Sequence, residues 1–349
     1  MKYIAPILFC LVVTSCSKTI SSEEKPVGIT SEKAQADLLN QIGHDYFIDD
    51  QHSYLGFKIK YFGYSPVRGR FNTFDGTAFY DTSDHASLCT TIFIDINSIN
   101  TGNERRDNDL KREGTWFDAI NHPYATFTSK QVVPNAEGGF ELVGELTIKD
   151  STKNVKFDFS EPTGISRDWA MNEQIDFEGK AIINRQDFGV YGGDFWSSVM
   201  ENGLTQLSDE VELELNIHCR RADYQARYND MDTTDVRKKI LDVIRSDGFE
   251  TASPIIHEAF KNEELSSGGM STIGFVLNEW KRYEDAIDLF ELKKKLAGEN
   301  ATVFTQLGIT HLLAENDSIA DTYFMNSFEL DSINSRTVLY SRLMETMSR

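Results

Sequence analysis

The chain is short of cysteine, of positive charge and of long apolar runs. Its 349 residues include 4 cysteines, and 35 Lys and Arg stand against 55 Asp and Glu, for a net charge of −20. This balance argues against nucleic acid and anionic lipid headgroups as main partners. No apolar run reaches the roughly 20 residues that a membrane-spanning helix needs, so we expect no bilayer span in the mature protein.

Catalytic and metal-binding motifs are missing as well. There is no Gly-x-Ser-x-Gly elbow, no His-Glu-x-x-His, no P-loop and no Gly-x-Gly-x-x-Gly after a strand. No Cys-x-x-Cys or His/Cys cluster indicates a metal site. We therefore predict a protein that is not an enzyme and has no cofactor, and rank an enzyme that acts on a lipid third among the functions considered.

The chain begins like a bacterial lipoprotein. Lys2 precedes an apolar stretch at residues 4–13, and Val-Thr-Ser then leads to Cys16 as in a lipobox. After cleavage before Cys16, its thiol would be a diacylglyceryl thioether and its amine would be acylated, and two or more acyl chains anchor a protein stably. The net charge would become −21, because Lys2 is the one charged residue lost. We predict a signal peptide at 1–15 and lipidation of Cys16; the alternative is an ordinary signal peptide with an incidental cysteine.

Two cysteines would remain unmodified in the mature protein. Cys10 would leave with the signal peptide, so Cys89 and Cys219 would be left. An exported protein can form a disulfide, but the spacing leaves this pairing open. Residues 16–44 are predicted to be a lipid-anchored polar tether with one short helix at 31–42.

Residues 45–219 alternate between apolar and polar side chains. Leu55, Phe57, Ile59 and Tyr61 share one face, which is typical of a strand with a dry and a wet side. The same alternation recurs at residues 90–96, 140–148, 155–159, 177–183 and 211–217. Many short antiparallel strands predict a sandwich or a closed barrel, and the periodicity does not choose between them.

Small residues on the predicted inner face bear on what the interior holds. Gly69, Gly144, Gly179 and Ala181 would leave space that leucine would fill. About eight strands enclose room for packed side chains or for one small ligand. The alternation alone favours a fully packed interior over an open lumen.

A series of short segments in order closely resembles the YceI-like family of lipid-binding β-barrels. The segments are His52-Ser53, Val-Arg-Gly-Arg-Phe at 67–71, Phe-Asp-Gly at 74–76, Ser-Ile-Asn-Thr at 98–101, Arg106-Asp107, Leu110, Phe117-Asp118, Pro123, Phe127, Gly-Glu-Leu-Thr-Ile at 144–148, Asn-Arg-Gln-Asp-Phe-Gly at 184–189 and Ser-Asp-Glu-Val at 208–211. The resemblance covers about half of the chain, residues 45–219. It implies a lipocalin-like antiparallel barrel of about eight strands, in place of the sandwich.

The resemblance also implies a ligand and a location. The ligand would be a long apolar lipid, an isoprenoid or isoprenoid quinone, sequestered or carried without chemistry in the bacterial cell envelope, with the anchor most simply in the outer membrane. It reverses the preference for a packed interior. The predicted lumen residues are Leu55, Phe57, Ile59, Tyr61, Phe71, Ile92, Ile94, Leu142, Leu146, Phe157, Phe177, Ala181 and Leu213.

Charged residues near these motifs have structural interpretations. We expect His52 to be a hydrogen-bonding residue and not a base. Arg106 with Asp107, and Arg185 with Asp187, are predicted to pair and to hold loops at the barrel mouth; an anion site is the alternative. The segment 116–120 is predicted to be a helical turn that closes one end, with a ligand contact by Trp116 or Phe117 as a second role.

Residues 235–349 change to a helical pattern, after a charged linker at 220–234. Gly274 and Gly308 are 34 residues apart, and so are two further pairs, Ala286 with Ala320 and Phe290 with Phe324. This period resembles the tetratricopeptide repeat, although His311 stands where the first unit has Leu277, and Ser332 replaces a proline. A weaker unit is predicted around Ala252, Ile256 and Ala259, and a capping helix at 336–347. Such repeats bind peptides or proteins, so the rival function is an envelope interaction scaffold with a packed barrel; a bundle that only stabilises the barrel is the third possibility.

Overall fold

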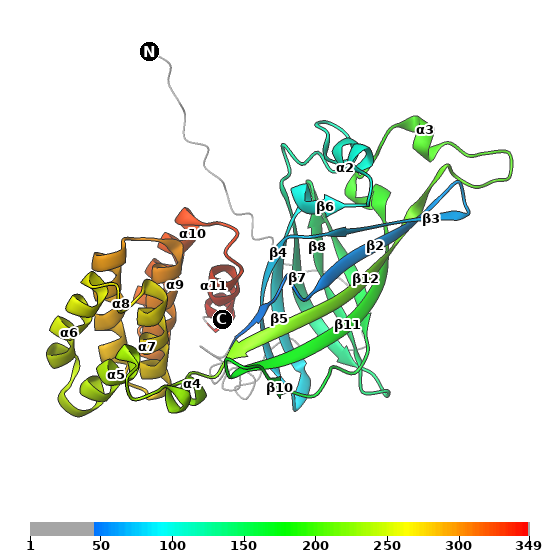
Figure 1. The fold of residues 1–349 in the computed structure, drawn as a ribbon. Coiled ribbons are helices and arrows are strands. Elements are labelled where there is room, and N and C mark those ends of the chain that lie inside the picture. The colour runs from blue at the N-terminus through cyan, green and yellow to red at the C-terminus, as the bar shows by residue number, and fades with distance from the viewer. Residues whose placement is uncertain (1–44, 348–349) are drawn as a thin grey trace, which may run out of the picture.

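The computed structural model describes residues 45–347, and within them every side chain except those of residues 342, 343 and 345–347. The predicted signal peptide, the lipidation site Cys16 and the tether at 16–44 lie outside the described residues. Figure 1 shows two parts side by side, a β-barrel and a layer of helices.

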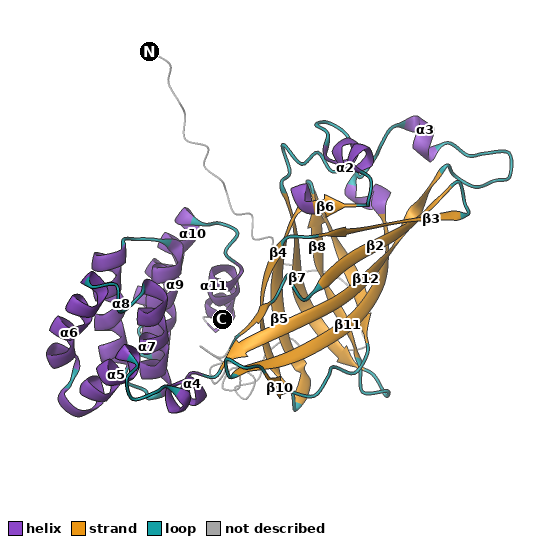
Figure 2. Ribbon diagram, viewed as in Figure 1, coloured by secondary structure: helices purple, strands orange, loops and turns teal. Residues whose placement is uncertain are grey.

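The barrel consists of antiparallel strands, and its two long connections, between β5 and β7 and between β11 and β12, lie at one end (Figure 2). The strands are β1 (Tyr46–Ile48), β2 (Tyr54–Tyr61), β3 (Ser65–Phe71), β4 (Phe74–Asp81), β5 (Asp84–Asp95), β6 (Ile99–Asn100), β7 (Tyr124–Pro134), β8 (Phe140–Ile148), β9 (Ser151–Phe159), β10 (Ser166–Arg167), β11 (Asn172–Asn184) and β12 (Leu207–Ala222). Two 3₁₀ turns, η1 (Ile96–Ser98) and η2 (Arg185–Phe188), and two short helices, α2 (Glu104–Lys111) and α3 (Asp194–Ser197), lie in the loops.

The sheet closes because its two longest strands pair with each other. β11 and β12 are in register from Asn172 opposite Ala222 to Asn184 opposite Glu210. The ring then runs β12-β1-β4-β5-β7-β8-β9-β11, and the β2–β3 hairpin adds to β12 beyond β1. The predicted barrel of about eight strands is confirmed, and the sandwich is wrong for this chain.

Alternation decides which side chains point into the barrel. Along β8, Phe140, Leu142, Gly144 and Leu146 are buried, whereas the alternate residues 141, 143 and 145 are partly exposed. Successive side chains of a strand point to opposite faces, so each apolar series forms one strip of the inner wall. These strips join in one core cluster.

The second part of the described chain is helical. Its helices are α4 (Tyr224–Asp230), α5 (Val236–Asp247), α6 (Phe249–Lys261), α7 (Ser267–Glu279), α8 (Tyr283–Ala297), α9 (Ala301–Leu313), α10 (Asp317–Leu330) and α11 (Ser335–Met347). The barrel followed by a helical domain is thus confirmed as the fold class. The predicted linker at 220–234 is not a spacer in the structure, because β12 runs to Ala222 and α4 then packs on α7.

The small residues of the 34-residue period lie where helices cross closely. A methyl group added to Gly274 would be 2.2 Å from the Phe290 ring, and one added to Gly308 would be 2.6 Å from Phe324. Ala286 and Ala320 are fully buried. Each Phe therefore packs on the glycine of the preceding helix, as the sequence pattern predicts for α7 with α8 and α9 with α10.

The helical domain docks on the outside of β4 and β5 through a buried interface. Phe79 of β4 lies edge-on to Tyr340 of α11, with 5.3 Å between ring centroids, in one cluster with Ile309 and Leu312 of α9. Figure 1 shows α11 between the barrel and the other helices. The two parts therefore share a core.

Polar contacts complete this interface. Thr77 of β4 and Ser335 share a buried 2.6 Å hydrogen bond. Arg336 donates to the buried carboxylate of Asp45 at 2.7 Å, and the Tyr340 hydroxyl donates to the same oxygen at 3.0 Å. The interface thus buries charge as well as apolar surface.

Candidate functional site: an apolar lumen open at one end

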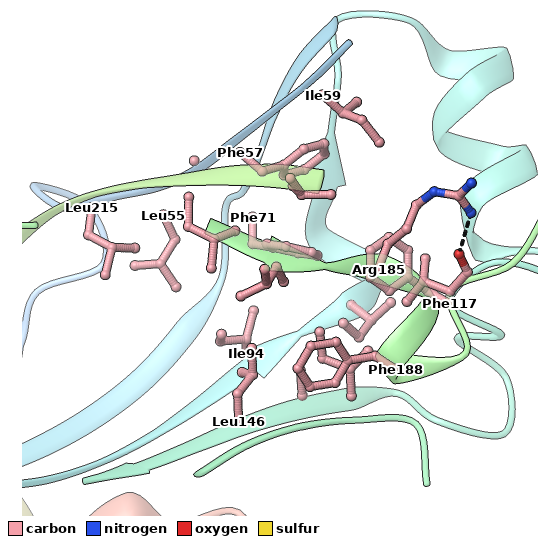
Figure 3. Close-up of a pocket in the computed structure, with 18 of the residues that line it drawn as sticks. Leu55, Phe57, Ile59, Phe71, Ile94, Phe117, Leu146, Arg185, Phe188 and Leu215 are labelled. Atoms are coloured by element: carbon pink, nitrogen blue, oxygen red, sulfur yellow. Dashed lines mark hydrogen bonds between the residues drawn. The ribbon is translucent and has the colours of Figure 1, made fainter. Parts of the chain in front are cut away.

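The barrel encloses a cavity of about 580 Å³. Its wall is built mainly from aliphatic and aromatic side chains of the inner strand faces, and Figure 3 shows Leu55, Phe57, Phe71, Ile94, Leu146 and Leu215 around it. Ligand pockets commonly have volumes of about 300–1,000 Å³ and mostly apolar walls. The interior is therefore not fully packed. The alternation alone had favoured a packed interior, and the structure contradicts that expectation.

Nearly all the predicted lumen residues line this cavity. They are Leu55, Phe57, Ile59, Tyr61, Phe71, Ile92, Ile94, Leu142, Leu146, Phe157, Phe177 and Leu213. That they contact a lipid stays a prediction. Ala181 is the exception: it lies on the inner face of β11 but is buried in the packed core, because its methyl group does not reach the cavity surface.

The inward glycines do not leave empty space. The position of an added methyl group on Gly69 is taken by the Phe57 ring, on Gly144 by Phe127 and on Gly179 by Phe159. The expectation that they would leave space is therefore wrong. Each ring instead lies across the glycine of a neighbouring strand, along the wall, which keeps the centre of the lumen open.

Aromatic side chains close the end of the barrel near β10. Phe177 lies edge-on to Tyr80 at 5.1 Å, and Phe140 stacks on Phe159 at 5.2 Å between ring centroids. The Tyr80 hydroxyl shares a 2.6 Å hydrogen bond with Nδ1 of His85, and burial raises the pKa of Tyr80 to about 12. The lumen is therefore blind at this end.

The opposite end reaches solvent and carries polar groups. Arg105 and Arg112, at α2 and just after it, line the cavity and are exposed, as is Tyr61 at the end of β2. Leu110 of α2 lines the cavity as well. The cavity thus combines an apolar chamber with an entrance that carries polar groups.

The α2 loop is fixed by two neighbouring charged residues that share one target. Arg106 donates from Nε to the Thr101 hydroxyl and from a terminal nitrogen to the Thr101 carbonyl, each at 2.8 Å. Asp107 accepts from the Thr101 backbone N–H at 2.9 Å. Arg106 and Asp107 therefore hold the loop at the mouth through Thr101, and the predicted direct pairing is wrong.

Arg185 has another partner than the one predicted. Its guanidinium forms a 2.8 Å ion pair with Asp209, not with Asp187, and donates to the carbonyls of Ser208 at 3.0 Å and Val190 at 2.9 Å. Figure 3 shows it at the cavity beside Phe188. Burial lowers the pKa of Arg185, and the Asp209 carboxylate opposes this. These bonds occupy the guanidinium, so Arg185 joins η2 to β12 and is no open anion site.

The predicted helical turn at 116–120 does not form. Trp116 instead makes an isolated antiparallel bridge with Tyr191 and has a positive φ of 33°. Its ring lies so close to Gly192 that an added methyl group there would be 1.9 Å from it. Trp116 and Phe117 still line the cavity, and a ligand contact by either of them stays a prediction.

Other residues of the wall escaped sequence reasoning. Trp196 lines the cavity from α3, Leu88 lines it from within β5, and Leu207 lines it from the start of β12. Leu88 continues the alternation of residues 90–96 by one step and could have been assigned to the inner face, whereas the neighbours of Trp196 and Leu207 show no such alternation. Leu215 shared the face of Leu213 in the pattern and could have been chosen.

The two cysteines of the described residues lie on different faces of the barrel wall. Cys219 faces the lumen, and burial raises the pKa of its thiol, whereas Cys89 packs from β5 against the helical domain. The two thiols are on opposite sides of the wall and form no disulfide.

His52 hydrogen-bonds to Asp49 at 2.8 Å in the turn before β2. Residues 45–347 contain no cluster of His, Cys, Asp and Glu that could hold a metal ion, and none of their helices is both long and apolar enough to cross a bilayer.

A closed antiparallel barrel with an apolar chamber and one polar entrance defines a ligand-binding β-barrel. The YceI-like domain family matches residues 46–219. A UPF0312 protein of Yersinia enterocolitica is 34% identical over 183 residues, which are 52% of this chain and 88% of that protein. A UPF0312 protein of Pseudomonas aeruginosa is 33% identical over 175 residues, 50% of this chain and 85% of the relative. The chain belongs to the YceI-like family.

Solved structures resemble the barrel part of the chain. BcnA of Burkholderia cenocepacia is 23% identical and matches 49% of this chain and 98% of its own, with a TM-score of 0.40. The YCEI protein of Campylobacter jejuni is 28% identical, with 50% and 96% coverage and a TM-score of 0.39. A polyisoprenoid binding domain from Saccharophagus degradans is 16% identical, with 51% and 98% coverage and a TM-score of 0.37.

Proposed function

We propose that this protein binds a long apolar lipid, an isoprenoid or isoprenoid quinone, in its barrel and carries or sequesters it without chemistry. The observation that supports this is the lumen of about 580 Å³, which is apolar along its length and polar only at its entrance. Each methylene group buried there would contribute roughly 0.8 kcal/mol. The blind aromatic end would limit the length of chain that fits.

The place of action in this proposal is the bacterial envelope. The lipobox before Cys16 supports a lipid anchor, most simply in the outer membrane, and membership of the YceI-like family is compatible with it. The anchor would hold the carrier beside the membranes that contain such lipids. A resident cofactor has no role in this function.

The rival function, a scaffold that binds a partner on tetratricopeptide-like repeats, has less support. In such repeats the first helix of each pair lines the binding groove. Here Phe275 of α7 stacks on Tyr224 of α4 and lies 5.0 Å from the Arg336 guanidinium, and Ile309 of α9 packs with Phe79. The chain's own residues thus occupy that side, and a partner would have to use exposed residues of α10 such as Met325 and Phe328.

The test is whether the lumen carries lipid. The full chain, purified under mild conditions, should release an isoprenoid-type molecule into an organic extract, as read by mass spectrometry. Ile94 lines the cavity, so Ile94→Trp should fill the lumen with an apolar ring, keep the fold and lower the lipid content. Ile94→Asp should empty or unfold the barrel, since an unpaired buried charge costs several kcal/mol.

A matched control lies on the outer wall of the same barrel. Ile182 of β11 is 67% exposed, so Ile182→Trp and Ile182→Asp should leave the lipid content unchanged. A folded parent protein without apolar lipid, from cells that make isoprenoids, would contradict the carrier function. Equal lipid content in Ile94→Trp and Ile182→Trp would show that the lumen is not the binding site.

A further inference from the structure

Exposed apolar side chains gather at the open end of the barrel. Tyr61 and Tyr64 come from the β2–β3 hairpin, and Phe195, Val199 and Leu204 come from α3 and the loop before β12; we call these five residues the mouth patch. Tyr64, Phe195 and Val199 are 78%, 59% and 68% exposed. In Figure 1 α3 and the tip of the β2–β3 hairpin project beyond the barrel at the end that holds α2, away from the helical domain.

The two segments that carry the mouth patch are joined to each other. The backbone N–H of Phe62 donates to the carbonyl of Gln206 at 2.7 Å. Leu204 packs over Gly63, at the tip of the hairpin, with a side-chain carbon 2.3 Å from where a methyl group on Gly63 would be. Val199 and Thr205 form a bridge that closes the loop. The mouth patch is therefore one protrusion.

The mouth patch is continuous with the cavity wall. Exposed Phe195 lies edge-on to Trp196, with 5.1 Å between ring centroids, and Trp196 lines the cavity. Trp196 in turn lies 6.1 Å from Tyr61, which belongs both to the mouth patch and to the cavity wall. An apolar path thus leads from solvent into the lumen.

We infer that the mouth patch inserts into the interfacial layer of a lipid bilayer, and that the apolar ligand passes between bilayer and lumen there. This inference rests on the proposed lipid-binding function. Aromatic side chains favour the membrane interface, and apolar side chains at the tips of turns can enter it without a shaped partner surface. A protein partner of standard size would instead need roughly 800 Å² of complementary surface.

The first experiment locates the mouth patch relative to the membrane without using the ligand. Full-length Phe195→Trp and Ile182→Trp are each bound to phosphatidylcholine vesicles with brominated acyl chains, which quench tryptophan fluorescence on contact. The parent protein supplies the common background, including any effect of the N-terminal segment. The Phe195→Trp protein should show additional quenching and the Ile182→Trp protein, with its probe on the outer wall, should show none. Equal quenching of the two probes would overturn the inference.

The second experiment measures transfer. Phe195→Ser combined with Leu204→Ser should slow the uptake of a fluorescent prenyl lipid from phosphatidylcholine vesicles about tenfold or more, and leave the final occupancy unchanged. The control is Trp169→Ser, which removes a 94% exposed aromatic residue at the closed end and should leave the rate as it is. An unchanged rate in the double variant would refute the role of the mouth patch in transfer. A parent protein that takes up no lipid would refute the proposed function instead, and the quenching result would still decide whether the mouth patch meets the bilayer.

Discussion

The buried interface between barrel and helices predicts that the two parts unfold together. Phe79 is the central test residue, because it points outward from β4, is fully buried and packs with α9 and α11. Its neighbour Ala78 points inward and lines the lumen. Phe79→Ala should therefore damage the interface and leave the lumen wall intact.

The size of the effect follows from the side chain that is lost. Truncation of a fully buried phenylalanine to alanine costs about 3–5 kcal/mol, through lost burial and the cavity left behind. Native proteins have total stabilities of about 5–15 kcal/mol, so we expect a loss of this size at the interface to separate the unfolding of the two parts. The Asp45–Arg336 ion pair would remain in the variant. It would be weaker, because loss of the Phe79 ring would let water closer to the interface that buries it.

Two probes separate the parts during thermal unfolding. The circular dichroism signal of helices follows mainly the helical domain. Tryptophan fluorescence follows mainly the barrel, which contains Trp116, Trp169 and Trp196, whereas the helical domain contains Trp280 at the end of α7. In the parent protein the two signals should change at one temperature. In Phe79→Ala they should separate, with the helical signal lost first, and Ile182→Ala should leave them coincident. Two separate transitions in the parent, or coincident ones in Phe79→Ala, would show that the interface does not couple the two parts.

Two further predictions concern other parts of the chain. Lys293 is buried, donates to Ser271 at 2.6 Å and to Gln306 at 2.8 Å, and burial lowers its pKa to about 8. The unfolded chain binds this proton more tightly than the folded chain does. Raising the pH from about 8 to 10.5 should therefore increase the free energy of unfolding of the parent, relative to that of Lys293→Met, by about 3 kcal/mol as measured by urea unfolding. A difference between the two proteins that stays constant with pH would contradict this. If Cys16 carries the anchor, Cys16→Ala should move the protein from the membrane to the soluble fraction, and a variant that still sediments with membranes after a salt wash would place the anchor elsewhere.

The sequence by itself determined the local patterns of this protein. A strand repeats every two residues, so alternation alone assigned Phe57, Ile92 and Leu146 to the inner face before any strand was paired. Close helix crossings need small residues, so the 34-residue spacing of Gly274 and Gly308 indicated the helix pairs. Both signals are spacings along the chain, of two residues in the strands and of 34 residues in the helical part.

Only the tertiary structure decided how distant segments meet. Closure of the sheet depends on pairing β11 with β12, and the open lumen depends on rings such as Phe57 lying over Gly69 of the next strand. The partner of Arg185 is Asp209 and not nearby Asp187, because β12, which carries Asp209, packs against η2 in the folded barrel. The burial of Phe79 on the outer face of β4 depends on α11, which packs against it. Such contacts join residues far apart in the sequence, and no local periodicity records them, because they depend on which faces meet when the whole chain packs.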